Sequence, residues 1–226
     1  QLAGRGGEGE VYRADDLKLG QTVAVKILPE SVRGDERRLA RLIQEVRTAR
    51  KVSHPNVCRV YDIVEADGQT FLTMEWIEGE SLAVVLQSKG RLPKLTAIGI
   101  ARQVALGLAA AHDEGVLHRD LKPGNIMIAD RGVVRITDFG LAESAASIRG
   151  AAAREGTPLY MSPEQLQGSD VTLQSDIYAL GLVLFELFTG RHAFPAAKLE
   201  EMLALRASPP PDPKALTPDL HPKIQK

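Results

Sequence analysis

The sequence is poor in three features that would assign it to a particular class of protein. It has one cysteine, Cys58, so it cannot form an internal disulfide, and a reducing compartment such as the cytoplasm is the expected location. Its net charge of -1 gives no reason to expect a nucleic-acid partner. Its longest apolar run, 177–188, is interrupted by Glu186 and is too short to span a bilayer. We therefore expect a cytoplasmic portion that does not span a membrane, although a longer protein could carry an anchor elsewhere.

The first third of the chain is predicted to be mainly β-strand. Its segments are rich in β-branched and apolar residues, and Asp67-Gly68 is a turn signal between two of them. One segment instead has apolar residues at spacings of three and four, which predicts a helix. The expected elements are a strand, glycine turn and strand over 2–14, strands over 22–28, 57–65 and 69–76, and a helix over 35–51.

The remainder of the chain is predicted to be mainly helical. Residues 94–113 have one apolar face, and residues 176–189 are apolar nearly all round, as in a helix at the centre of a core. The six prolines within 207–222 favour an extended connector. These features predict an α+β fold with two lobes: an N-lobe over 1–77, formed by a small antiparallel sheet with one helix, and a mainly helical C-lobe over 78–226.

A glycine-rich motif lies at the start of the chain. Gly4, Gly6, Gly9 and Val11 match G-x-G-x-x-G-x-V, in which the glycines let backbone N–H groups approach phosphates closely. A dinucleotide-binding turn has the same glycine spacing but needs a helix directly afterwards. Residues 10–13 instead continue as a strand, which favours a phosphate-covering hairpin.

Two charged residues lie on predicted buried faces. Strand alternation places Lys26 on the same face as Ala24, whose small side chain leaves room for a flat base. Glu45 lies on the apolar ridge of the 35–51 helix, beside Leu42. A buried lysine needs a partner, so we expect an ion pair between Lys26 and Glu45. Two separate solvated charges are the alternative.

The most specific motif is His118-Arg119-Asp120-Leu121-Lys122-Pro123-Gly124-Asn125, a full match to H-R-D-x-x-x-x-N. Asp120 could accept the proton of an incoming hydroxyl, and Asn125 could hold Mg²⁺. Thirteen residues after Asn125, Asp138-Phe139-Gly140 follows an apolar strand, and Asp138 could bind a metal that bridges phosphates.

On these motifs the chain resembles the eukaryotic-type protein kinases, and its motif sequences are similar to those of the bacterial Ser/Thr kinases of that family. The resemblance implies the two-lobed kinase fold and an activity that uses ATP and Mg²⁺, with Mn²⁺ as an alternative. It implies that Asp120, Lys122, Lys26 and Glu45 are catalytic and that Asn125 and Asp138 bind the metal. The implied ATP-binding residues are Gly4, Gly6, Gly9, Val11, Ala24, Lys26, Met74, Glu75, Ile77 and Met127.

The resemblance also concerns the substrate-binding side. Lys122 and the Gly-Thr-Pro triplet at Thr157 resemble the Ser/Thr-specific branch, and Glu164 matches the glutamate of the Ala-Pro-Glu triplet. The sequence departs from the family pattern in two places. Residues 149–155 carry no hydroxyl, so we expect weak or no switching by phosphorylation at the usual site. The sequence ends before the helices that supply an arginine partner for Glu164, so we expect a catalytic domain truncated at its C-terminus.

The resemblance therefore predicts a protein Ser/Thr kinase that acts in signalling, with ATP and protein substrates, itself included, as partners. Two alternatives remain. A pseudokinase would bind nucleotide without turnover, but it usually lacks one of the motif residues that this chain retains. A small-molecule kinase would share the fold, but rarely the Gly-Thr-Pro and Pro-Glu features. The sequence leaves dimerisation open.

Overall fold

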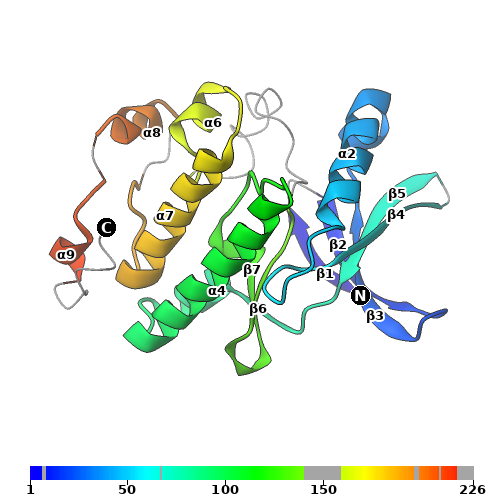
Figure 1. Cartoon of the computed structure of the whole chain (residues 1–226), viewed down its shortest axis with the longest axis horizontal. Helices are drawn as coiled ribbons and strands as arrows, with labels where there is room; N and C mark the ends of the chain where they lie inside the picture. The colour runs from blue at the N-terminus through cyan, green and yellow to red at the C-terminus, as the bar shows by residue number, and fades with distance from the viewer. Residues whose placement is uncertain (7–8, 67, 140–158, 196–198, 209, 218–226) are drawn as a thin grey trace.

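The computed structural model describes residues 1–6, 9–66, 68–139, 159–195, 199–208 and 210–217 (Figure 1). The strands are β1 (Leu2–Gly6), β2 (Gly9–Asp16), β3 (Gln21–Ile27), β4 (Val60–Ala66), β5 (Gln69–Glu75), β6 (Gly79–Ser81), β7 (Ile126–Ala129) and β8 (Val134–Ile136). The helices are α1 (Glu30–Arg33), α2 (Glu36–Ala49), α3 (Leu82–Lys89), α4 (Lys94–Asp113), α6 (Pro163–Gln167), α7 (Leu173–Thr189), α8 (Leu199–Arg206) and α9 (Pro213–Leu216), with 3₁₀ turns η1 (Pro123–Asn125) and η2 (Asp130–Gly132).

The N-terminal part is a five-stranded antiparallel sheet in the order β1-β2-β3-β5-β4. Its central strand, β3, has buried residues on both sides of the pleat, Val23 on one and Ala24 and Lys26 on the other. Helix α2 packs against the sheet through Leu42 and Val46, which join β-strand residues such as Leu72 in one apolar cluster. Asp35 caps α2, since its carboxylate accepts from the backbone of Arg37 and Arg38.

The C-terminal part is built on two long helices, α4 and α7, and α4 lies between α7 and the small sheet β6-β7-β8 (Figure 1). Ile100, Val104 and Leu108 of α4 pack with Val183 and Leu187 of α7 in the larger core cluster. Among the described residues, α4 is the one helix whose length and composition would suffice to cross a membrane. Its buried side chains lie in this core, which accounts for its apolar composition.

The predicted α+β class and two-lobed kinase fold are confirmed, and the predicted strands and long helices lie where the sequence placed them. Two predictions are wrong in part. The N-lobe has a second helix, α1, a single turn that starts after Pro29 and ends at Gly34. The 207–222 connector contains the short helix α9, because Pro213 is tolerated in the first turn of a helix.

Candidate active site

The residues predicted to surround the adenine base meet on the N-lobe sheet. In the strand register Val11 pairs with Lys26, and Ala24 pairs with Met74. Ala24 and Met74 are buried in the same apolar cluster, and Val11 and Ile77 pack against it. Three of the predicted base-contacting residues therefore lie on the adjacent strands β2, β3 and β5, and a fourth, Ile77, follows β5. Met127, the fifth, lies on β7 in the C-terminal part.

The glycine motif forms the β1–β2 hairpin, in which Gly6 pairs with Gly9. Gly9 has φ +116°, and a Cβ atom there would lie 2.3 Å from the carbonyl oxygen of Ile27. Glycine is thus required at this position by both backbone conformation and close approach. Gly4 has open space around it, so its lack of a side chain leaves the strand surface clear. Residues 7 and 8 lie outside the described residues.

Lys26 is 5% exposed, and its ammonium contacts the Oδ1 atom of Asp138 at 2.8 Å. The predicted ion pair between Lys26 and Glu45 is wrong for this structure. The Glu45 carboxylate instead accepts from Arg119 of the catalytic loop, and from Arg41 at 3.3 Å. Sequence spacing placed Glu45 correctly on the inner side of α2, but it could not show that a guanidinium 74 residues away lies within reach.

The catalytic loop brings its three predicted polar residues together. Lys122 Nζ lies 2.5 Å from Asp120 Oδ2. The Asn125 amide donates to the Asp120 carbonyl at 2.9 Å and to its Oδ2 at 3.1 Å. Asp120 thus sits in a network of donors that fixes the orientation of its carboxylate, as the acceptor of a hydroxyl proton requires.

The segment around Asp138 is tied to the same loop through Thr137. The Thr137 N–H donates to the Asn125 carbonyl at 2.9 Å, and the His118 ring bonds the Thr137 carbonyl at 2.9 Å. The His118 ring also lies 4.7 Å from that of Phe139, centroid to centroid. Asp138 itself has φ +61°, a strained conformation for a residue with a side chain. These contacts hold Asp138 and Asn125, the two predicted metal ligands, on adjoining segments.

A buried carboxylate on α7 anchors the catalytic loop. Asp176 is 1% exposed and accepts from the backbone N–H of His118 at 2.7 Å and of Arg119 at 2.8 Å. The ring of His112 donates to it at 2.8 Å. Arg119 has φ +69°, so these two backbone bonds hold the chain in a conformation it would otherwise avoid.

Gln165 is a positioning residue that the sequence reasoning missed. Its Nε2 atom donates to the Arg119 carbonyl at 2.7 Å, which gives the strained residue a second support. Gln165 also closes a capping box with Ser162 at the start of α6. The pattern S-x-x-Q at 162–165 could have predicted the cap. Nothing in it indicates a contact with residue 119.

On the predicted substrate side, Thr157 lies outside the described residues and Glu164 lies at the start of α6. The hydroxyl of Ser175 donates to the Glu164 carboxylate, and no arginine among the described residues pairs with it. Burial alone would raise the pKa of Glu164, but hydrogen bonds from Ser175 and other donors outweigh it, so the pKa is lowered. Ser175 thus partly replaces the arginine that the resemblance implied.

The donor chemistry of Asp138 and Asn125 fits a Mg²⁺ site. Both offer side-chain oxygens, the ligands that Mg²⁺ prefers, and Mg²⁺ usually needs few protein ligands because phosphates and water supply the others. The Asn125 amide nitrogen is already directed at Asp120, which leaves its oxygen as the group available to a metal. Among the described residues no group of three His, Cys, Asp or Glu forms a separate metal centre.

This fold and arrangement are those of a protein kinase domain, and the family model for the protein kinase domain matches residues 1–211. The chain belongs to that family.

Its similarity to named bacterial proteins is substantial. It is 38% identical over 234 residues to the serine/threonine-protein kinase PknA of Mycobacterium tuberculosis, covering 100% of this chain and 53% of PknA. It is 39% identical over 196 residues to the serine/threonine-protein kinase PrkC of Bacillus subtilis, covering 86% of this chain and 30% of PrkC. The solved PknI kinase domain of M. tuberculosis superposes with a TM-score of 0.77 at 28% identity, covering 97% of this chain and 81% of that one. The chain thus spans about half or less of these curated relatives.

Proposed function

We propose that this chain is an ATP-dependent protein kinase that transfers the γ-phosphate to Ser or Thr hydroxyls of proteins in signal transduction, with the chain itself among the candidate substrates. One observation carries the proposal. Asp120, Lys122 and Asn125 form one contact network, and Thr137 ties that network to Asp138. A hydroxyl-orienting carboxylate therefore lies beside the groups that suit a metal-bound phosphate, which is the arrangement that phosphoryl transfer needs.

Each group has a distinct role in this proposal. Asp120 accepts a hydrogen bond from the incoming hydroxyl and takes its proton as the oxygen attacks the γ-phosphorus, while the bond from the γ-phosphorus to the bridging oxygen breaks and ADP leaves. Lys122, 2.5 Å from Asp120, stabilises the charge on the transferring phosphoryl group. Asp138 and Asn125 would hold Mg²⁺, which when bound neutralises charge on the phosphates; Mn²⁺ offers the same chemistry. Most of the rate enhancement then comes from positioning and electrostatics.

The nucleotide is proposed to lie against the N-lobe sheet. Val11, Ala24 and Met74 offer an apolar surface for the base, with Met127 on the opposite side, and the backbone of Glu75 and Ile77 offers hydrogen-bonding groups at its edge. The β1–β2 hairpin with Gly4, Gly6 and Gly9 would cover the phosphates. The ion pair between Lys26 and Asp138 supports this placement, because it brings the phosphate-binding cation to the metal-binding carboxylate.

Glu45 has a catalytic role in this proposal only after a change of partner. In this structure the Glu45 carboxylate forms an ion pair with Arg119, and Lys26 forms one with Asp138. Transfer to Lys26 requires α2 to bring Glu45 towards β3 as the ion pair with Arg119 breaks. Both ion pairs are partly shielded from water, and one replaces the other, so the free-energy difference between the arrangements is expected to be only a few kcal/mol.

The remaining assignments follow the sequence. We propose lobes at 1–77 and 78–226, because the N-lobe apolar cluster ends with Trp76 and Ile77. Thr157 and Glu164 are proposed to belong to the peptide-docking segment. We propose a cytoplasmic location from the single cysteine and the expected use of ATP. The net charge of -1 supports a portion without a nucleic-acid partner, and the core position of α4 supports one that does not span a membrane.

The proposal is tested by phosphoamino-acid analysis of a basic acceptor protein incubated with the chain, Mg²⁺ and γ-labelled ATP. Label on phosphoserine or phosphothreonine is expected, and label on phosphotyrosine alone would contradict the specificity. A pseudokinase would bind ATP in a parallel titration and transfer no label. Replacing Mg²⁺ with Mn²⁺ in a third series shows which metal supports the faster transfer.

A further inference from the structure

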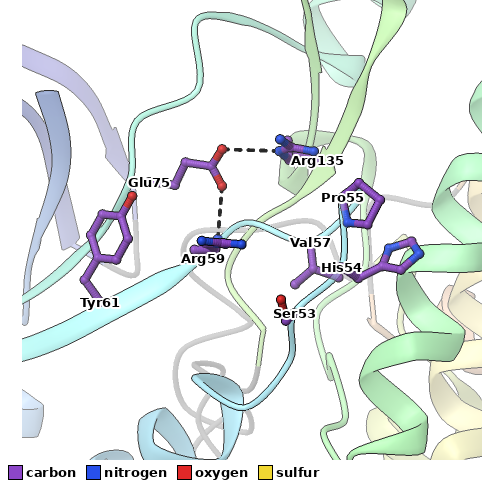
Figure 2. Close-up of a pocket in the computed structure, with 8 residues that line it drawn as sticks. All are labelled: Ser53, His54, Pro55, Val57, Arg59, Tyr61, Glu75 and Arg135. Atoms are coloured by element: carbon purple, nitrogen blue, oxygen red, sulfur yellow. Dashed lines mark hydrogen bonds and ion pairs between the residues drawn. The ribbon is translucent and has the colours of Figure 1, made fainter. Parts of the chain in front are cut away.

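A cavity of about 420 Å³ lies outside the proposed catalytic site, where the α2–β4 connection meets β5 and β8 (Figure 2). Its polar lining comes from Ser53, His54, Arg59, Tyr61, Glu75 and Arg135. None of the residues proposed to contact phosphates or metal lines it. Of the proposed nucleotide residues only Glu75 takes part, through its side chain rather than its backbone.

The cavity has more cationic groups than its single carboxylate can balance. Glu75 Oε1 accepts from the Nε atom of Arg135 at 3.3 Å, and its Oε2 accepts from the backbone N–H of Arg59 at 3.2 Å (Figure 2). The Nη1 atom of Arg135 is buried without a hydrogen-bond partner. The guanidinium of Arg59 has no hydrogen bond or ion pair to any described residue. The Arg59 side chain is exposed, so the lining has two guanidinium groups and one carboxylate, and that carboxylate already accepts from Arg135 Nε and from the Arg59 backbone.

The neutral groups of the lining are also donors. The Nδ1 atom of His54 accepts from the Asn56 N–H at 3.1 Å, so the proton of the neutral ring lies on Nε2. Burial and the nearby Glu75 raise the pKa of the Tyr61 hydroxyl, which therefore stays protonated. The buried Nη1 atom of Arg135 lacks a partner, which is costly, and an anionic ligand would supply an acceptor to it and to the neighbouring donors at once.

We propose that this cavity is a second binding site, specific for a phosphate monoester, with Arg59 and Arg135 as its main contacts. Guanidinium groups bind phosphate oxygens in a bidentate geometry, and a phosphate oxygen would accept from the buried Nη1 atom of Arg135. The volume suits a phosphorylated side chain or a small phosphometabolite. Val57, on the wall of the cavity, offers an apolar contact to the carbon skeleton that carries the phosphate.

The site is connected to the nucleotide-binding part through Glu75. A phosphate bound to the Arg135 guanidinium competes with the Glu75 carboxylate for that group. Glu75 ends β5, and its N–H donates to the Arg59 carbonyl at 2.9 Å. The next residue, Trp76, is the only tryptophan of the chain, so its fluorescence reports occupancy of the cavity.

The test is a fluorescence and calorimetric titration of the whole chain with inorganic phosphate, O-phosphoserine and a phosphoserine peptide, with serine as the uncharged control. Arg59→Gln is expected to weaken phosphoserine binding at least about tenfold, the loss of one charge-assisted contact. Arg37→Gln is the matched control, because it removes an exposed arginine from the first turn of α2, about 20 Å of helix away. Lys26→Met should leave the affinity unchanged, which separates this site from the proposed ATP phosphates.

Saturable binding that falls in Arg59→Gln and persists in Arg37→Gln and Lys26→Met supports the site. Tighter binding of the peptide than of O-phosphoserine assigns the ligand to a phosphoprotein; equal or weaker binding of the peptide assigns it to a small phosphoester. Absence of saturable binding by the wild type up to about 10 mM, a very weak interaction, overturns the proposal. Equal affinity in Arg59→Gln and wild type, or affinity lost in Lys26→Met, overturns it as well.

Discussion

The anchoring of the catalytic loop by Asp176 gives a prediction whose magnitude follows from the structure. The carboxylate is 1% exposed and accepts three N–H donors, two from the backbone of His118 and Arg119 and one from the ring of His112. In Asp176→Asn one oxygen becomes an NH₂ group that cannot accept. At least one buried donor therefore loses its partner, and the remaining bonds lose the assistance of a charge.

The expected loss of stability is about 3–5 kcal/mol, the cost of removing one partner from a buried charged network. For a chain of this size each kcal/mol corresponds to about 2–4 °C, so the melting temperature should fall by roughly 10 °C. Circular dichroism melts measure it, with Asp113→Asn as the control, since that exposed residue of α4 carries the same charge. A melting temperature within about 2 °C of the control would refute the anchoring role.

Three further predictions concern packing, the buried thiol and the helix glutamate. Gly107→Ala should lower the free energy of unfolding in urea by about 1–3 kcal/mol, because the new Cβ would lie 2.8 Å from the Asn56 carbonyl oxygen. Gly99→Ala, on the exposed side of the same helix, should raise it by up to about 1 kcal/mol. Equal effects of the two substitutions would contradict the close packing at Gly107. Burial raises the pKa of the Cys58 thiol, so a thiol reagent at pH 8 should label the folded chain at least about 100-fold more slowly than the unfolded one. Because the folded state keeps the thiol protonated, the free energy of unfolding should fall as the pH rises above about 9, where the thiol of the unfolded chain ionises. Fast labelling of the folded chain would show that the thiol is accessible. Glu45→Gln should lower the phosphotransfer rate at least about tenfold if Glu45 must pair with Lys26 during turnover, and an unchanged rate would make its bond to Arg119 its only role.

The sequence predicted local structure well where periodicity carries the information. The helix over 35–51 and the strands around Lys26 are set by apolar spacing, and α2 and β3 lie there. Spacing also placed Glu45 on the inner side of α2. Motif order predicted which residues of the catalytic loop and of the Asp138 segment would meet, because both segments are short and the intervening β7–β8 hairpin is a local structure.

The sequence could not predict which of several possible ionic partners a residue takes. Glu45 has Lys26 and Arg119 as candidate partners, and the position of α2 relative to the C-lobe decides between them. That position depends on packing over the whole interface, which no local pattern encodes. The same limit explains why the contacts of Gln165 with Arg119 and of Arg135 with Glu75 were missed: each joins residues 46 or more positions apart. Each of these side chains, viewed alone, resembles an ordinary surface residue.

The central claim is that Asp120 and Lys26 serve ATP-dependent phosphate transfer, and label transfer from γ-labelled Mg-ATP tests it most directly. Wild type is compared with Asp120→Asn and Lys26→Met, and with Asp130→Asn as a control that removes an exposed carboxylate from η2. The account predicts transfer by wild type and Asp130→Asn, and a loss of about 10²-fold or more in the other two variants. Transfer that persists in Asp120→Asn at the rate of the control would contradict the assignment of the catalytic residue.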